Sequence, residues 1–181
     1  VQRTARLVIP QGYDATQSVP LVLVFHGYTQ TAEAIENISE MTPLAEQHGF
    51  VVAYPQGPGN SWNAGKCCGS GSSQQRPDIQ FVSDLIDALS SELCIDPKRI
   101  YAAGFSNGGM LSNRIGCELS DRIAAIGPVA GPRAIDACSP TRPMPVFELH
   151  GTSDFVVPYN GGGLGGAISV QANVDYWKKI G

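Results

Sequence analysis

The stretch Gly104-Phe105-Ser106-Asn107-Gly108 decides the fold. It is a Gly-x-Ser-x-Gly pentapeptide, and the apolar run at 100–103 directly before it is typical of a buried strand. A strand followed by this pentapeptide predicts a nucleophile elbow, where the chain turns so sharply into a helix that both flanking residues must be small. We therefore expect Ser106 to project into a cleft, with the backbone N–H of Asn107 placed to stabilise an oxyanion.

A second, almost unbroken apolar run, Pro20-Leu-Val-Leu-Val-Phe25, leads into His26-Gly27-Tyr28. Continuous hydrophobicity is expected for a strand that helices cover on both faces. A His-Gly turn at the carboxyl end of such a strand supplies the second oxyanion N–H in hydrolases of this architecture, and we assign that donor to the Tyr28 backbone. We expect the His26 side chain to order the loop by hydrogen bonding.

A further strand is predicted at 145–150, and the loop after it carries Gly151-Thr152-Ser153-Asp154. In α/β-hydrolases the acid follows the serine on such a loop, where its carboxylate accepts the N–H of a histidine and fixes the tautomer. Asp154 is therefore the predicted triad acid. An aspartate in this context is also a good turn residue, so the motif alone leaves both interpretations open.

Strand-like and helix-like segments alternate along the chain, which predicts an α/β fold with a mostly parallel sheet and helices on both faces. The strands are expected near 5–9, 20–26, 50–54, 99–105, 123–129 and 145–150, and the helices near 39–48, 78–93, 107–119 and 169–179. The Gly-, Ser- and Pro-rich segment 56–76 is expected to be a loop on the active-site side.

Several motifs together resemble a secreted esterase family that contains feruloyl esterases, acetylxylan esterases and polyhydroxybutyrate depolymerase-like enzymes. They are His26-Gly-Tyr-Thr-Gln30, Gly49-Phe-Val-Val-Ala-Tyr-Pro55, Trp62-Asn63, Cys94-Ile-Asp-Pro-Lys-Arg-Ile-Tyr101, Gly104-Phe-Ser-Asn-Gly-Gly109 and His150-Gly-Thr-Ser-Asp154. The resemblance runs from about residue 5 to the end, and Cys94-Ile-Asp-Pro97 is most similar to the feruloyl esterase branch. It implies an α/β-hydrolase fold, a serine mechanism without metal or cofactor, and ester substrates.

One departure from the resembled family concerns the catalytic histidine, which the family carries on a Gly-rich loop well beyond the acid. No histidine follows His150 in this sequence. We expect His48 to end a helix, His26 to order its loop and His150 to be a scaffold residue beside the acid loop. Residues 1–181 are therefore expected to form a single α/β-hydrolase catalytic domain whose C-terminal part is missing, a length that is short for a complete enzyme of this class.

Five cysteines, at positions 67, 68, 94, 117 and 138, are many for a cytosolic domain of this size. They lack the Cys-x-x-Cys spacing with nearby histidines that zinc sites use, so we expect disulfides, no metal and a secreted, extracellular protein. The sequence leaves the pairings open. The pair we expect is Cys117 with Cys138, whereas the adjacency of Cys67 and Cys68 disfavours a bond between them.

The composition argues against some classes of binding partner. The formal net charge is −4 without a Lys/Arg cluster, which argues against nucleic acid and anionic membrane surfaces. No segment approaches the roughly 20 apolar residues of a membrane span. Trp62 and Tyr159 are candidates for lining a subsite for an aromatic ring or a sugar face, and ordinary partial burial is the alternative for each.

Three functions fit this sequence. The first is hydrolysis of feruloyl or acetyl esters of plant cell-wall polysaccharides through an acyl-enzyme on Ser106. The second is depolymerisation of short-chain polyhydroxyalkanoates. The third is a hydrolase-like binding module without turnover, which the absent histidine keeps open.

Overall fold

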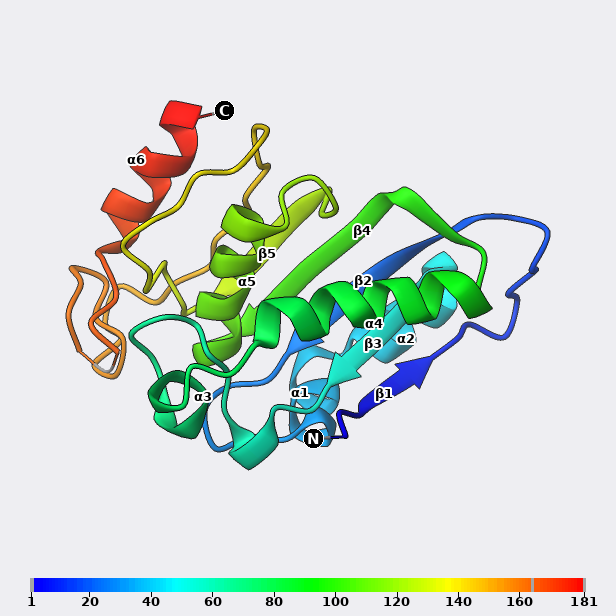
Figure 1. The fold of residues 1–181 in the computed structure, drawn as a ribbon, viewed down its shortest axis with the longest axis horizontal. Coiled ribbons are helices and arrows are strands. Elements are labelled where there is room, and N and C mark those ends of the chain that lie inside the picture. Colours follow the sequence, from blue (N-terminus) through cyan, green and yellow to red (C-terminus); the bar gives the residue numbers. More distant parts are fainter. Residues whose placement is uncertain (1, 164, 181) are drawn as a thin grey trace.

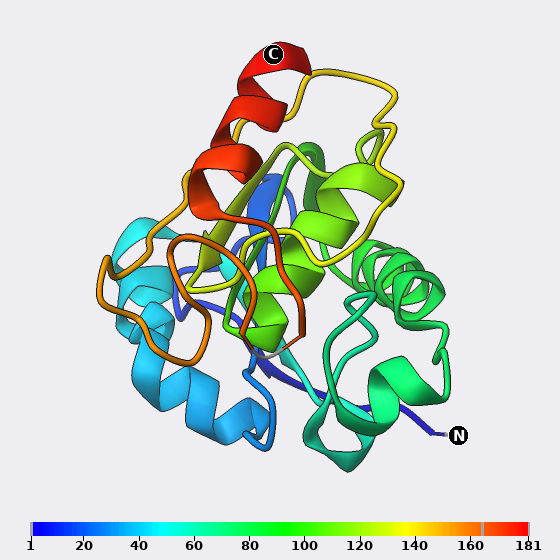
Figure 2. The same ribbon diagram turned by 90° about the vertical axis from the view of Figure 1, so that its left-hand side faces the viewer.

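The computed structural model describes residues 2–163 and 165–180. It has three layers, with the sheet in the middle, α1 (Ala32–Ser39) and α2 (Met41–His48) on one face, and α4 (Asp78–Glu92) and α5 (Asn107–Glu118) on the other (Figures 1 and 2). This arrangement is the α/β class that the alternating pattern predicts.

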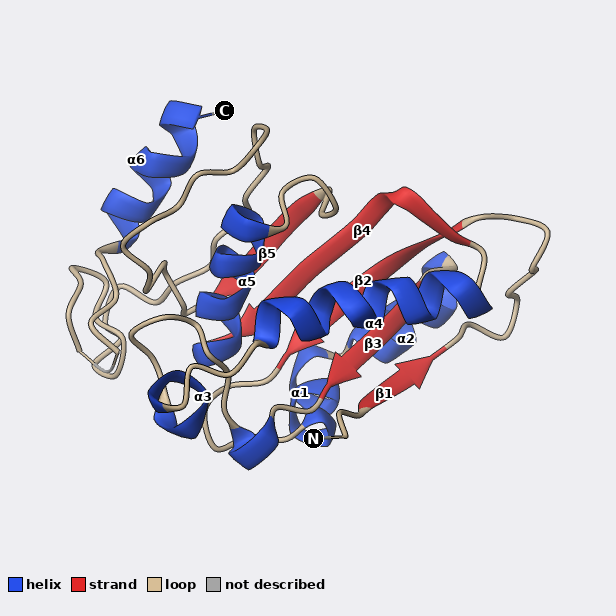
Figure 3. Cartoon of the chain, viewed as in Figure 1, coloured by secondary structure: helices blue, strands red, loops and turns tan. Residues whose placement is uncertain are grey.

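The sheet has the strand order β1-β3-β2-β4-β5. Its strands, drawn red in Figure 3, are β1 (Ala5–Val8), β2 (Val19–Phe25), β3 (Val51–Pro55), β4 (Ile95–Phe105) and β5 (Ala125–Val129). Only β1 is antiparallel to its neighbour, β3. Because β2, β3, β4 and β5 are parallel, their carboxyl ends meet at one edge of the sheet, where ligand sites of open α/β sheets lie.

Alternation along β2 explains why the strand reads as a continuous apolar run. Leu21, Leu23 and Phe25 belong to the core under α4 and α5, whereas Val24 belongs to the core under α1 and α2. Both faces of the strand are therefore buried, as expected for a central strand between two helical layers.

The last helix, α6 (Val170–Ile180), packs on α5 through buried polar groups. The Asn113 side-chain oxygen accepts from Trp177 Nε1 at 2.9 Å and from Asn173 Nδ2 at 3.1 Å. Asn173 Nδ2 also donates to Glu148 Oε2 at 2.7 Å. This network joins α5, α6 and the segment at 145–150.

Several boundaries differ from the sequence prediction. The helix expected at 39–48 is α2, and the prediction missed α1, which ends just before it at Glu40 in the left-handed region at φ 51°. The loop at 56–76 contains the short helices η1 (Pro58–Asn60) and α3 (Gly69–Ser73). The strand expected at 145–150 is reduced to two parallel bridges, Ile126 with Val146 and Val129 with Leu149.

Candidate active site

The elbow lies at the carboxyl end of β4, where Ser106 precedes the first residue of α5. Its φ is 53° and its ψ is −116°, a conformation that a residue with a side chain adopts only at a cost. The backbone holds it there, because Ser106 N donates to Val129 O at 2.8 Å and Ser106 O accepts from Met110 N at 2.9 Å. Such strain at the tip of a strand-to-helix turn is typical of a nucleophile elbow.

Two glycines make this turn possible. A Cβ on Gly104 would come within 2.5 Å of the Gly108 backbone, and a Cβ on Gly108 would overlap the carbonyl oxygen of Phe25. The helix start therefore packs directly on the end of β2, backbone against backbone. This close approach explains why both flanks of the serine are glycine.

The loop after β2 lies beside the elbow, since Phe25 pairs with Gly104 in the sheet register. Thr29 sits in the left-handed region at φ 66°, and its N–H donates to Asn60 O at 2.8 Å. Within the described residues, no backbone hydrogen bond uses the N–H of Tyr28 or Asn107 as a donor. Both amides therefore remain available for a ligand oxygen.

His26 is a buried scaffold residue. Its Nδ1 faces Gly27 O at 2.8 Å, and its Nε2 accepts from Gly57 N at 3.0 Å, so both ring nitrogens are used by backbone groups. Burial lowers the pKa of His26 below its ordinary value, because the charged imidazolium is poorly solvated there. A ring bound at both nitrogens cannot accept the proton of Ser106.

Asp154 lies on the loop after the bridged segment at 145–150, as a triad acid should. Its Oδ1 accepts from the backbone N–H groups of Val156 and Val157, both at 2.9 Å. Its Oδ2 lies 3.6 Å from His150 Nε2. One carboxylate oxygen is thus fixed by backbone amides, and the other faces His150.

His150 is not placed as the base. Its side chain is only 1 % exposed, and its Nε2 lies 2.7 Å from Val157 O, where it donates. Its Nδ1 is buried without a partner among the described residues. Among these residues, no hydrogen bond joins the ring to the Ser106 hydroxyl.

His48 lies at the opposite end of the sheet. It is exposed in the last turn of α2, just before Gly49 at φ 70°, and this turn precedes the start of β3. Since Ser106 follows the end of the parallel strand β4, His48 and Ser106 lie at opposite ends of the strands. The elbow and Asp154 therefore stand on one edge of the sheet without a histidine from 26, 48 or 150 in a catalytic position.

The prediction that Trp62 lines a subsite is wrong. The side chain is 0 % exposed, with its ring packed edge-on against Phe25 at 5.4 Å between centroids and parallel to Phe81 at 6.5 Å. Its Nε1 donates to His26 O at 3.0 Å. Trp62 is a core residue under the loop that begins at His26, because its own loop folds inward over the sheet.

Tyr159 is half-buried beside the acid loop, with its ring edge-on to His150 at 6.0 Å between centroids. Its role in binding an aromatic ring or a sugar stays a prediction.

Two disulfides are present. Cys117 and Cys138 are joined, with their Cα atoms 5.0 Å apart. Cys67 and Cys68 are also joined, across a cis peptide bond, which contradicts the expectation from their adjacency. Cys94 has no disulfide partner among the described residues. Among the described residues, no three His, Cys, Asp or Glu side chains gather closely enough to hold a metal ion.

Glu148 is a half-buried acid that sequence reasoning missed. Burial raises its pKa above the ordinary value, and its Oε1 has no partner among the described residues. The alternation at 145–150 points the opposite way, because an apolar inner face would bury Phe147 and Leu149, which are 68 % and 50 % exposed, whereas Glu148 contacts Asn173 of α6.

Comparison with known proteins agrees with this geometry. The family model described as "Esterase PHB depolymerase" matches residues 4–162. The chain belongs to this family. It is 41 % identical over 162 residues to feruloyl esterase B of Piromyces equi, an alignment that covers 84 % of this chain and 29 % of that protein. It is 37 % identical over 142 residues to a bifunctional acetylxylan esterase/xylanase of Neocallimastix patriciarum, covering 77 % and 20 %.

Among solved structures, a thermostable esterase shares the fold of this family member. It has a TM-score of 0.72 and 21 % sequence identity, covering all of this chain and 48 % of that one. The chain thus spans less than a third of the two curated relatives and about half of this structural neighbour. The similarity supports an α/β-hydrolase fold for residues 1–181.

Proposed function

We propose that this domain is a serine carboxylesterase that hydrolyses feruloyl or acetyl esters of plant cell-wall polysaccharides. The observation that carries the proposal is the strained Ser106 at the start of α5, with the free N–H groups of Asn107 and Tyr28 beside it. A serine at a strand-to-helix turn, next to two amides without a backbone acceptor, is the arrangement that acyl transfer requires. Relatives named feruloyl esterase and acetylxylan esterase support the choice of ester.

In the proposed reaction, Ser106 Oγ attacks the ester carbonyl and its proton passes to a histidine. The amides of Tyr28 and Asn107 hold the oxyanion of the tetrahedral intermediate. Collapse expels the alcohol, which takes the proton from the histidine, and leaves an acyl-enzyme that water then hydrolyses. Asp154 Oδ2 accepts the second N–H of the histidine, whose charged form it stabilises.

We infer that the histidine comes from sequence outside residues 1–181. The imidazoles of His26 and His150 are engaged with backbone groups, and His48 lies at the far end of the strands. The exposed Phe147 and Leu149 support the same inference, because they leave apolar surface at the edge of the sheet that further residues would cover. The domain at 1–181 is then one part of a longer catalytic domain.

A secreted location forms part of this proposal. The Cys117–Cys138 disulfide supports it, since such bonds persist in oxidising compartments. Across residues 2–163 and 165–180, none of the helices is both long enough and apolar enough to cross a bilayer.

The test compares residues 1–181 with a protein extended by the native sequence that follows. We expect the extended protein to hydrolyse p-nitrophenyl acetate, methyl ferulate and acetylated xylan, and the short chain to show little or no turnover. Release of 3-hydroxybutyrate from polyhydroxybutyrate, without ferulate or acetate release, would favour the depolymerase alternative that the family name raises. Full Ser106-dependent turnover by the short chain would contradict the inferred external histidine.

A further inference from the structure

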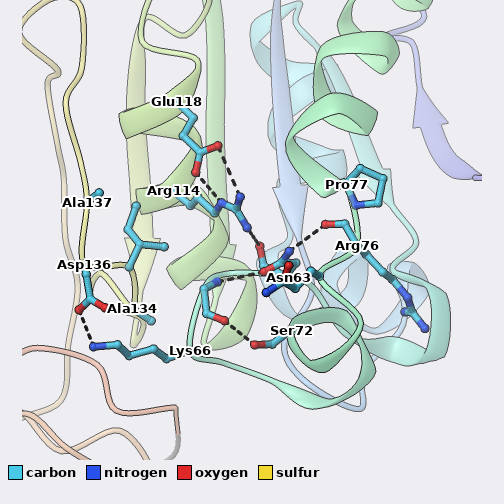
Figure 4. A pocket seen from close by; sticks show the side chains of 13 residues that line it. Asn63, Lys66, Ser72, Arg76, Pro77, Arg114, Glu118, Ala134, Asp136 and Ala137 are labelled. Carbon is cyan, nitrogen blue, oxygen red and sulfur yellow. Dashed lines mark hydrogen bonds and ion pairs between the residues drawn. The ribbon is translucent and has the colours of Figure 1, made fainter.

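A polar groove lies beside the C-terminal half of α5 (Figure 4). Its volume is about 610 Å³, within the range of about 300–1,000 Å³ that is usual for ligand sites. Four segments form its walls: the loop at 63–66, the turn at 72–77, the C-terminal half of α5 and the loop at 134–137. None of the residues that line it is aromatic.

The polar groups of the groove are held in place by one another, as the dashed lines in Figure 4 show. Arg114 donates from Nε to Glu118 at 2.6 Å and from Nη1 to Asn63 O at 2.9 Å. Lys66 Nζ lies 2.5 Å from Asp136 Oδ1, and the Lys66 backbone N–H donates to Ala134 O at 2.9 Å. Arg114 is therefore held in place before a ligand arrives, whereas Lys66 and Asp136 form an exposed pair.

The charged side chains of the groove indicate which class of ligand it can bind. Carboxylates at Glu118 and Asp136 already pair with Arg114 and Lys66, and Arg76 donates to Pro58 O and Gln74 Oε1, so a phosphate or sulfate would have to displace these partners. A flat apolar ligand would find no ring to stack on. A neutral sugar suits this lining best, because each hydroxyl both donates and accepts and can add to paired groups without breaking them.

The groove is connected to the elbow by two of its own walls. The loop at 63–66 follows Trp62, whose N–H donates to Asn107 Oδ1 at 2.8 Å. The loop at 134–137 follows Gly131, where a Cβ would overlap the carbonyl oxygen of Ser106. Along α5, the eight residues from Ser106 to Arg114 span about 12 Å at 1.5 Å per residue. A small ester bound at Ser106 would not reach the groove, whereas a polymer could occupy both.

We propose that this groove binds the neutral glycan backbone of a polysaccharide whose ester group lies at Ser106. The proposal rests on the esterase function proposed above and adds a second contact with the substrate, remote from the bond that is cleaved. Since the groove and the elbow share two loops, the groove fixes where along the polymer the ester is presented.

Direct binding of an oligosaccharide without ester groups tests the groove independently of catalysis. The probe is xylohexaose, titrated calorimetrically into the wild-type protein and into a triple variant with Lys66→Ala, Gln75→Ala and Asp136→Ala. These three residues are exposed, so the fold should survive, which circular dichroism would verify. We expect the variant to bind at least fivefold more weakly, and a control with Lys98→Ala and Asp121→Ala, an exposed pair outside the groove, to bind like the wild type.

Two outcomes would overturn the groove proposal: no binding of xylohexaose by the wild type, or equal binding by the wild type and the triple variant. Displacement of the sugar by millimolar inorganic phosphate would also overturn it, because it would mark the groove as an anion site. Binding by a Ser106→Ala variant should equal that of the wild type. Absence of ester turnover by the extended protein, with intact, groove-dependent sugar binding, would contradict the esterase function alone.

Discussion

The side-chain amide of Asn107 holds the backbone of Trp62 on both sides: its Oδ1 accepts from Trp62 N at 2.8 Å, and its Nδ2 donates to Trp62 O at 3.2 Å. Both residues are fully buried. Asn107 therefore has two roles in this fold. Its backbone amide faces the proposed oxyanion, and its side chain fastens the loop that underlies the site.

Replacing Asn107 with alanine should leave the buried N–H and C=O of Trp62 without partners. Each unsatisfied buried group costs about 1–3 kcal/mol, so we expect Asn107→Ala to lower the free energy of unfolding by about 2–4 kcal/mol. Urea denaturation measures the loss. The exposed Asn160→Ala serves as control and should change stability by less than about 0.5 kcal/mol. A loss for Asn107→Ala no larger than that of the control would contradict the fastening role.

The strained backbone conformation of Ser106 should lower the free energy of unfolding. At φ 53° and ψ −116° a side chain is strained, by about 1–3 kcal/mol, and glycine is not. Since glycine also loses more entropy on folding, we expect Ser106→Gly to be more stable than Ser106→Ala by about 1 kcal/mol in thermal unfolding. In the extended protein both variants should lose several orders of magnitude in kcat. Equal stability of the two variants would show that Ser106 carries no strain.

Asp154→Asn should separate catalysis from structure. The asparagine oxygen can still accept from the N–H groups of Val156 and Val157, so the loop should keep its shape. A neutral amide cannot hold the triad histidine in the correct tautomer, and we expect kcat of the extended protein to fall by about 10⁴. Asp154→Ala, which removes both backbone contacts as well, should in addition lower the melting temperature. A loss of kcat below about tenfold in Asp154→Asn would point to another acid.

Glu148 predicts a pH dependence of stability. Burial raises its folded pKa above the ordinary value of 4.5, so the folded state binds more protons than the unfolded state between these two pKa values. Stability contributed by the protonated acid is thus present below about pH 4.5 and is lost as the pH rises through the folded pKa. Glutamine stays neutral and can still accept from Asn173.

We therefore expect Glu148→Gln to exceed the wild type in stability at pH 8 by more than it does at pH 4. Denaturant unfolding at both values measures the two differences. Asp175→Asn, an exposed change on α6, is the matched control and should show no such trend. A difference between Glu148→Gln and wild type that is the same at both pH values would contradict burial of a charged group at 148.

The sequence predicted most of the sheet because its central strands are apolar on both faces. The apolar runs at 20–25 and 100–103 are typical of strands buried between two helical layers, and the glycines around Ser106 indicated the elbow. The helix α1, which the sequence prediction missed, was harder to foresee. The start of α1 depends on Thr31, whose Oγ1 accepts from Ala34 N at 3.1 Å, and its end depends on a left-handed Glu40.

Trp62 shows where sequence reasoning failed. A tryptophan in a Gly- and Ser-rich loop suggested an exposed stacking surface, yet the loop is drawn inward by Asn107 and by Asp78, whose Oδ2 accepts from Asn63 N at 2.7 Å. Both contacts join residues far apart in the chain, so no local pattern reports them. The same holds for Glu148, whose burial depends on a helix that begins 22 residues later, at Val170.

The contact of Gly104, Gly108 and Gly131 with neighbouring backbone also bears on how such an enzyme can be altered. None of these three positions can accept a side chain without strain, because each added Cβ would meet main-chain atoms. In a mutant library designed for a new ester or a new polymer, most substitutions at these glycines would disrupt the elbow. Random substitutions are better introduced in the loops at 63–66 and 134–137. These loops pack against the elbow at one end and carry solvent-exposed side chains, such as Lys66 and Asp136.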